Sequence, residues 1–254
     1  MTRFTVELGL GDDVDGELEL TVHLVPPVES EIMVELEALL GRFVRAGDRG
    51  AFVRAELPPT AARFTVRSRS LKGSGITYIC DVAGTDPRFA RVLRNALVMF
   101  SEVSHPVQSL CVRAKGARGS LPHGIGGPAV DEYYPSVSQR LTFPHEVTPA
   151  DALRGSRYAV ISFARALDDA CADKVVAWLE DWSEMAMGGY AASEQSLESG
   201  DCAIFDAIPD LRDEATVEMP VSMFGAPDIA WSSLLNLCGR IDAELASVAS
   251  VTIR

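Results

Sequence analysis

The chain has 254 residues, of which 47% are hydrophobic and 23% charged, and it carries a formal net charge of −13. This length accommodates two packed domains, and the composition excludes collagen-like and broadly disordered chains. No apolar run reaches the roughly 18 residues of a membrane span, and acids replace the apolar block of a secretory signal near the N-terminus. We therefore expect a soluble, cytoplasmic protein without a membrane partner.

The first half of the chain reads as alternating strands and helices. Apolar and polar residues alternate at period two over residues 4–10 and 18–24, around a glycine-flanked turn, which predicts a β-hairpin. Residues 30–46 place apolar side chains on one helical face. The remaining predicted elements of this half are strands at 51–57, 63–70 and 76–83, a helix that begins at Pro87, and a strand at 107–115.

Residues 116–150 lose this periodicity and are rich in Gly, Pro and Ser. The chain is thereby divided into an N-terminal half over residues 1–115, a linker or long loop over 116–156, and an acidic C-terminal half over 157–254.

The second half has the order β-α-β-β-α-β. The predicted elements are strand 158–166, helix 169–187, strands 202–207 and 215–219, helix 227–245 and strand 248–253. The first half follows the same order. We therefore predict an α+β fold of two ferredoxin-like halves, each an antiparallel sheet with helices on one face, with an extra hairpin strand in the N-terminal half. The similarity of the halves is one of pattern, since no residue-level repeat is seen, and this architecture implies no activity.

A search for chemical motifs is mostly negative. The five cysteines contain no C-x-x-C pair, and the four histidines lie too far apart for metal-binding spacing. No nucleophile-elbow, phosphate-binding or dinucleotide-binding motif occurs. We therefore predict no cofactor, no metal and no catalytic residue.

The charge is unevenly distributed. Residues 1–125 hold 15 basic and 15 acidic residues, whereas residues 126–254 hold 8 and 21. Such a field repels nucleic acid and attracts a basic protein, although acidity also serves solubility alone. The sequence does not indicate the oligomeric state.

The acids are densest on the helix from Asp169. Like charges at i,i+4 destabilise a helix by a few tenths of a kcal/mol each, so helix stability alone does not explain them. The predicted partner-binding residues are Asp169, Asp173, Glu180, Asp181, Glu184, Asp206, Asp210, Asp213 and Glu214.

Two basic stripes also occur. Arg88, Arg91 and Arg94 recur at three-residue spacing on the helix from Pro87, and we interpret them as a solvated face. Arg67 and Arg69 are expected on one side of their strand.

Three functional hypotheses follow. The first is a non-enzymatic module that masks a basic partner; its acidity, α+β pattern and missing catalytic motifs resemble small bacterial toxin-immunity proteins, a likeness of composition alone. The second is an enzyme or small-ligand regulator with a pocket between the halves, lined by His123, Tyr133, Tyr134 and His145. The third is an assembly subunit that pairs through exposed sheet edges.

Overall fold

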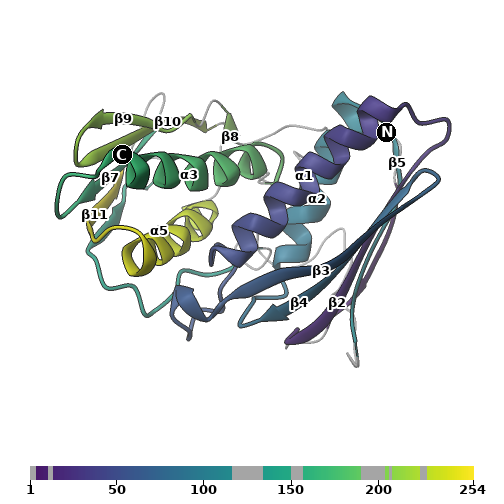
Figure 1. Ribbon diagram of the computed structural model, residues 1–254, viewed down its shortest axis with the longest axis horizontal. Coiled ribbons are helices and arrows are strands. Elements are labelled where there is room, and N and C mark those ends of the chain that lie inside the picture. Colours follow the sequence, from purple (N-terminus) through teal and green to yellow (C-terminus); the bar gives the residue numbers. More distant parts are fainter. Residues whose placement is uncertain are drawn as a thin grey trace.

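The protein is a mixed α+β structure with two mixed sheets and four α-helices among its described residues. The computed structural model describes residues 4–10, 14–115, 134–149, 157–189, 204–205, 208–223 and 228–254. Helices of the two halves pack against each other in the middle of the molecule, and α1 and α2 cover the face of the N-terminal sheet that points toward the C-terminal half (Figure 1).

The N-terminal half contains a five-stranded sheet of order β1-β5-β2-β4-β3. Its elements are β1 (Thr5–Gly9), β2 (Gly16–Leu24), α1 (Ser30–Asp48), β3 (Arg63–Lys72), β4 (Gly75–Ala83), α2 (Phe89–Val103) and β5 (Val107–Ala114).

The predicted hairpin at the start of the chain is wrong. Strands β1 and β2 are not neighbours, because β5 lies between them and pairs in parallel with β1 and antiparallel with β2. The sheet is therefore mixed, not purely antiparallel. Alternation of apolar residues determines which face a strand buries, but it does not determine which strand lies beside it.

The predicted strand at 51–57 is also wrong. This segment is a series of turns with one isolated bridge, from Val53 to Thr85. Its apolar residues are buried for a different reason, since the ring of Phe52 packs 5.0 Å from that of Phe43 and 6.3 Å from that of Phe89. Gly50 precedes the segment with a φ of 85°, a conformation that turns the chain away from an extended path.

The C-terminal half contains a second sheet of order β6-β11-β7-β10-β8, with β9 also paired to β10. Its elements are β6 (His145–Val147), β7 (Arg157–Phe163), α3 (Asp169–Gly189), β8 (Ile204–Phe205), β9 (Asp210–Asp213), β10 (Thr216–Met223), α5 (Ser232–Glu244) and β11 (Val248–Ile253). Strand β6 comes from the segment expected to be a linker, and it pairs in parallel with β11. Strand β9 was not predicted.

A buried core links the halves. Helix α3 packs against α1 and α2 across the middle of the molecule. On its other side, the indole of Trp182 stacks on that of Trp231 at 6.3 Å and 19°, and its Nε1 donates a hydrogen bond of 2.9 Å to Ser233 Oγ. Both tryptophans are fully buried, and each such side chain contributes a large apolar area to the core.

Candidate functional site

The acids of α3 separate into two groups with different surroundings. Asp181 faces α1, where it accepts hydrogen bonds from Nε (2.9 Å) and Nη2 (2.7 Å) of Arg45 and from Nη1 of Arg49 (2.5 Å). Glu184, close to one helical turn further on, is ion-paired with Arg42. These two predicted partner-binding residues are therefore engaged within the chain, at the contact between its halves.

The electrostatics at Asp181 favour its charged form. Burial alone would raise the pKa of this carboxyl, but hydrogen bonds and charge from Arg45 and Arg49 outweigh it and hold the pKa below its usual value. Hydrogen bonding to Asp181 raises the pKa of Arg45, whereas burial lowers the pKa of Arg49. Both guanidinium groups stay charged at neutral pH. Arg49 also lies 4.9 Å from the ring centroid of Trp178, which adds a cation–π contact.

The second group of acids lies at the start of α3 and beside the turn that joins β9 to β10. The two segments are joined by a backbone hydrogen bond of 2.7 Å from Leu167 N to Glu214 O. Asp168 accepts a hydrogen bond of 2.8 Å from Cys171 N in the first turn of α3, and Asp213 accepts one from Ala215 N in the β9–β10 turn.

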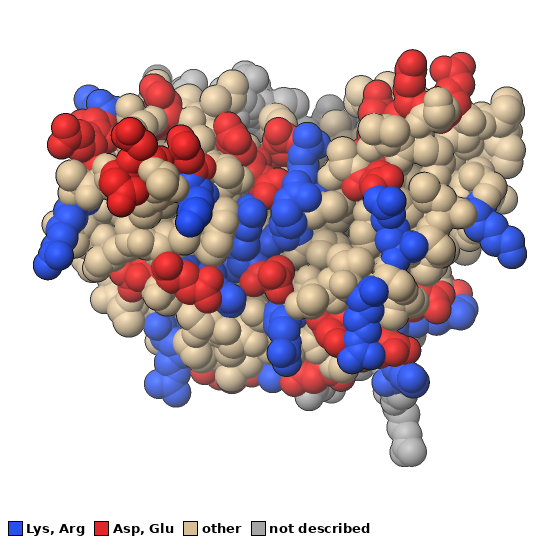
Figure 2. All heavy atoms as spheres, viewed as in Figure 1, with Lys and Arg blue, Asp and Glu red and all other residues tan. Residues whose placement is uncertain are grey.

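We call these exposed carboxylates the acidic surface. Figure 2 shows acidic side chains gathered over the end of the molecule where Figure 1 places β9 and β10. The members of the acidic surface are Asp168, Asp169, Asp173, Asp210, Asp213 and Glu214.

The members of the acidic surface differ from Asp181, Glu184 and Glu218 in that they lack ion pairs in the described structure. Within the described ranges, none of the six forms an ion pair, whereas the neighbouring Glu218 pairs with Arg212 at 2.5 Å. The exposed Arg165 and Lys174 are also in this region. Glu180 is exposed on the same row of α3 as Asp169 and Asp173. Asp206 lies outside the described residues, and Asp168 is a member that the sequence patterns did not single out.

The four residues of the predicted pocket are not brought together by what the structure describes. His123 and Tyr133 lie outside the described residues. Tyr134 is buried and accepts a hydrogen bond of 3.4 Å from Asn95 Nδ2 on α2. His145 is exposed on β6, with its ring 6.2 Å from that of Phe143. Tyr134 and His145 therefore contact different elements.

The expectation of a solvated arginine stripe on α2 is wrong. Arg91 is 8% exposed, and Arg88 forms an ion pair of 2.5 Å with the buried Asp86. The reason is that α2 is covered twice, by its own sheet on one face and by α3 and residues 134–138 on the other. In the C-terminal half, Arg157 of β7 is also buried, at 3% exposure. Its guanidinium carbon lies 5.8 Å from the centroid of the Trp231 ring.

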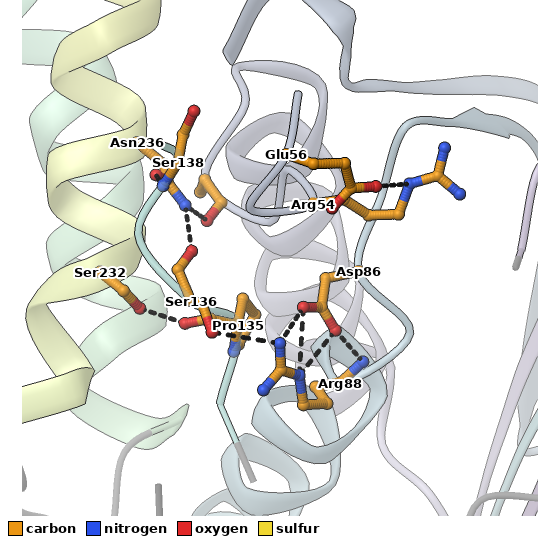
Figure 3. A network of polar contacts seen from close by, with 10 residues as sticks. Arg54, Glu56, Asp86, Arg88, Pro135, Ser136, Ser138, Ser232 and Asn236 are labelled. Atoms are coloured by element: carbon orange, nitrogen blue, oxygen red, sulfur yellow. Dashed lines mark hydrogen bonds and ion pairs between the residues drawn. The ribbon is translucent and has the colours of Figure 1, made fainter. Parts of the chain in front are cut away.

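Residues 134–138 connect the halves through a polar network (Figure 3). Asn236 on α5 accepts a hydrogen bond of 2.7 Å from Ser138 N and donates one of 3.0 Å to Ser136 O. Ser138 Oγ in turn donates to Leu57 O at 2.6 Å, and Ser136 Oγ accepts from Arg88 at 3.3 Å. Ser136 and Ser138 therefore form hydrogen bonds with both halves at once.

The described residues hold no set of three side chains arranged to bind a metal ion. Burial raises the pKa of the Cys80 thiol to about 12 and that of Cys238 well above its usual range, so both thiols are protonated and unreactive at neutral pH. None of the helices in the described part of the chain is long and apolar enough to cross a bilayer.

Comparisons with known proteins do not identify a family. No protein-family model matches the chain, and no curated protein matches it. Among solved structures, a DyP-type peroxidase from Cellulomonas bogoriensis aligns at 14% identity over 96% of this chain and 90% of that one, with a TM-score of 0.23. The ferredoxin protease FusC in complex with Arabidopsis ferredoxin aligns at 13% identity over 91% of this chain and 33% of that one, with a TM-score of 0.21.

We predict that Asp181→Asn destabilises the protein at neutral pH by about 1.5 kcal/mol, because it removes charge-assisted hydrogen bonds from a poorly exposed site. The folded pKa of Asp181 is depressed, so its stabilising effect is present above the unfolded carboxyl pKa of about 4 and is lost as the pH falls through the folded value. The difference between wild type and variant, measured by urea denaturation across this range, should therefore shrink toward low pH.

Asp173→Asn is the matched control, since Asp173 lies on the same helix and forms no ion pair among the described residues. It should change stability by less than about 0.5 kcal/mol. Equal effects of the two substitutions would contradict the assignment of Asp181 to the contact between the halves.

We also predict that Asn236→Ala destabilises the protein by about 2 kcal/mol, because it leaves the buried Ser138 N–H and the half-buried Ser136 carbonyl without their partner. The measurement is the midpoint of urea unfolding. Gln108→Ala removes an exposed amide side chain from β5 and should have little effect. A neutral Asn236→Ala variant would show that residues 134–138 do not depend on this network.

Proposed function

We propose that the protein is a non-enzymatic binding module whose acidic surface masks a basic protein partner. At the level of fold, we propose that each half is a ferredoxin-like unit with added strands, β1 in the N-terminal half and β6 and β9 in the C-terminal half. The strand orders β5-β2-β4-β3 and β11-β7-β10-β8 support this, since each reads last, first, third, second for a β-α-β-β-α-β unit. The added strands β1 and β6 pair in parallel with the last strand of their half, and the added strand β9 pairs antiparallel with β10.

One observation carries the functional proposal. Six exposed carboxylates from two segments lie on one end of the molecule and form no ion pair within the described part of the chain, while Asp181 and Glu184 on the same helix are paired. Acids that only served solubility need not be gathered in this way. Gathered carboxylates speed the encounter with a cationic surface and select against acidic competitors.

Apolar side chains beside the acids support a specific complex. Ile208 and Leu211 are among the large hydrophobic residues exposed to solvent, and Leu211 belongs to the same short strand as Asp210 and Asp213. In protein interfaces, such anchors limit dissociation, while surrounding charges mainly raise the association rate. The acidic surface would occupy lysine and arginine side chains that the partner uses for its own substrate, as in a bacterial toxin held by its immunity protein.

We predict that the quadruple variant Asp169→Asn, Asp173→Asn, Asp210→Asn, Asp213→Asn raises the Kd for the partner by at least about tenfold and weakens its dependence on salt. The partner is first captured on the immobilised wild-type chain at about 50 mM salt, eluted at higher ionic strength, identified and purified. Titration calorimetry at several salt concentrations then compares the variants.

The matched control changes four exposed acids of the N-terminal half, Glu19, Glu29, Glu31 and Glu102, to Gln. It alters the net charge by the same amount and should keep the wild-type Kd. If both quadruple variants lose affinity equally, the effect is one of overall charge, and the site assignment fails. If the wild-type chain retains no basic protein, the proposed function fails.

A further inference from the structure

Strand β3 forms an open edge of the N-terminal sheet. It is ten residues long and pairs with β4 on one side, and in the described part of the chain no strand lies on its other side. An open edge presents unpaired backbone N–H and C=O groups, which form a template for an added strand.

The register of β3 shifts between Val66 and Ser68. Because of this bulge, Arg67 is ion-paired with Asp81, whereas Arg69 lies opposite Tyr78 and is ion-paired with Glu37 of α1. The expectation that both arginines lie on one side of the strand is therefore wrong. Beyond the bulge, residues 68–72 keep a regular register with β4 and form the straight part of the edge.

Exposed apolar side chains border this straight part on the α1 side. Leu71, opposite the buried Ile76, is 52% exposed, and Val34 of α1 is 65% exposed. Asp48 Oδ1 accepts a hydrogen bond of 3.0 Å from Phe64 N, so the end of α1 lies at the start of β3. Arg69, later in β3, is ion-paired with Glu37, earlier in α1, so the two elements run in opposite directions. The Arg69–Glu37 pair then places Leu71 and Val34 at about the same level.

The charge of β3 indicates which kind of segment can bind at its edge. Strand β3 contains four basic residues, Arg63, Arg67, Arg69 and Lys72, and no acid. Glu37 and Asp81 neutralise two of them, while Arg63 and Lys72 form no ion pair among the described residues. Charged side chains and bulges on an edge strand can serve only to prevent aggregation. Large exposed apolar side chains such as Leu71 and Val34 work against that purpose.

We infer that the open edge of β3, together with α1, is a docking site for an extended acidic segment of a partner protein. The segment adds as a strand along residues 68–72. Its acidic side chains meet Lys72, and its apolar side chains cover Leu71 and Val34. The site lies in the N-terminal half and is independent of the proposed acidic surface, so the protein would bind partners of opposite charge at separate places.

The test uses a fluorescent peptide of alternating Glu and Val with the full-length protein. Fluorescence anisotropy should detect binding to the wild type. Lys72→Glu should weaken it by at least about fivefold, while Lys174→Glu, which reverses an exposed lysine of α3, should leave it unchanged. Likewise, Leu71→Ser should weaken binding. Val103→Ser, which changes an exposed apolar residue at the end of α2, should not.

Two further measurements separate strand addition from simple charge attraction. A peptide methylated at every backbone nitrogen keeps its charge but cannot pair as a strand through either edge, and it should not bind. Amide hydrogen exchange of residues 68–72 should slow when the unmodified peptide is added.

Three results would overturn the inference: no binding of the Glu-Val peptide, equal binding of the methylated peptide, or equal binding to Lys72→Glu. Sedimentation of the wild-type chain alone tests whether a second copy of this chain occupies the edge. Self-association that Lys72→Glu abolishes would show this and would overturn the inference of a partner protein. These outcomes do not depend on the acidic surface, whose quadruple variant should bind the peptide normally.

Discussion

The packing of α3 against α1 and α2 is the contact on which the arrangement of the two halves depends. It combines a buried apolar core with the ion pairs of Asp181 and Glu184 to the arginines of α1. A partly buried carboxylate that receives hydrogen bonds from two guanidinium groups is costly to separate from them, because each charge would then lose its partner before water fully replaces it. The same helix stacks Trp182 on Trp231 of the C-terminal half. Helix α3 therefore belongs to the cores of both halves.

The packing of α3 against α1 also determines which acids of α3 remain exposed and without an ion pair in the described structure. The helix carries its acids on more than one side, and the side that meets α1 is neutralised there. The acids at the start of α3 lie beyond the reach of α1 and meet the β9–β10 turn, which brings more acids and few bases. The electrostatic field of the C-terminal half is therefore concentrated at its outer end. A field arranged in this way acts on approaching molecules more than on the stability of the fold.

The remaining polar residues of the contact show how the chain crosses from one half to the other. Residues 134–138 are hydrogen-bonded to Asn236 on one side and to Leu57 and Arg88 on the other. A segment with these bonds cannot leave one half without losing bonds to it, so the network resists relative movement of the halves. By contrast, no strand of the described structure pairs with β3 on the side away from β4, and β3 packs mainly against β4 and α1.

The amino-acid sequence by itself determined the class of the fold, the four helices and most strands, because the periods of 2 and 3.6 record which face of each element is buried. Strand 248–253 and helix α3 were located from this signal to within about two residues. The periodicity could not determine which strands lie side by side, such as β5 between β1 and β2 or β6 beside β11. Nor could it predict the turns at 51–57. All of these depend on contacts between residues distant in sequence. The same holds for the sites. The sequence located the acids of α3, but only the tertiary structure decided that Asp181 is paired, that Arg91 is buried and that Asp168 joins the exposed group. The physical reason is that a side chain's charge is local information, whereas its desolvation and its partners are properties of the surface that packs against it.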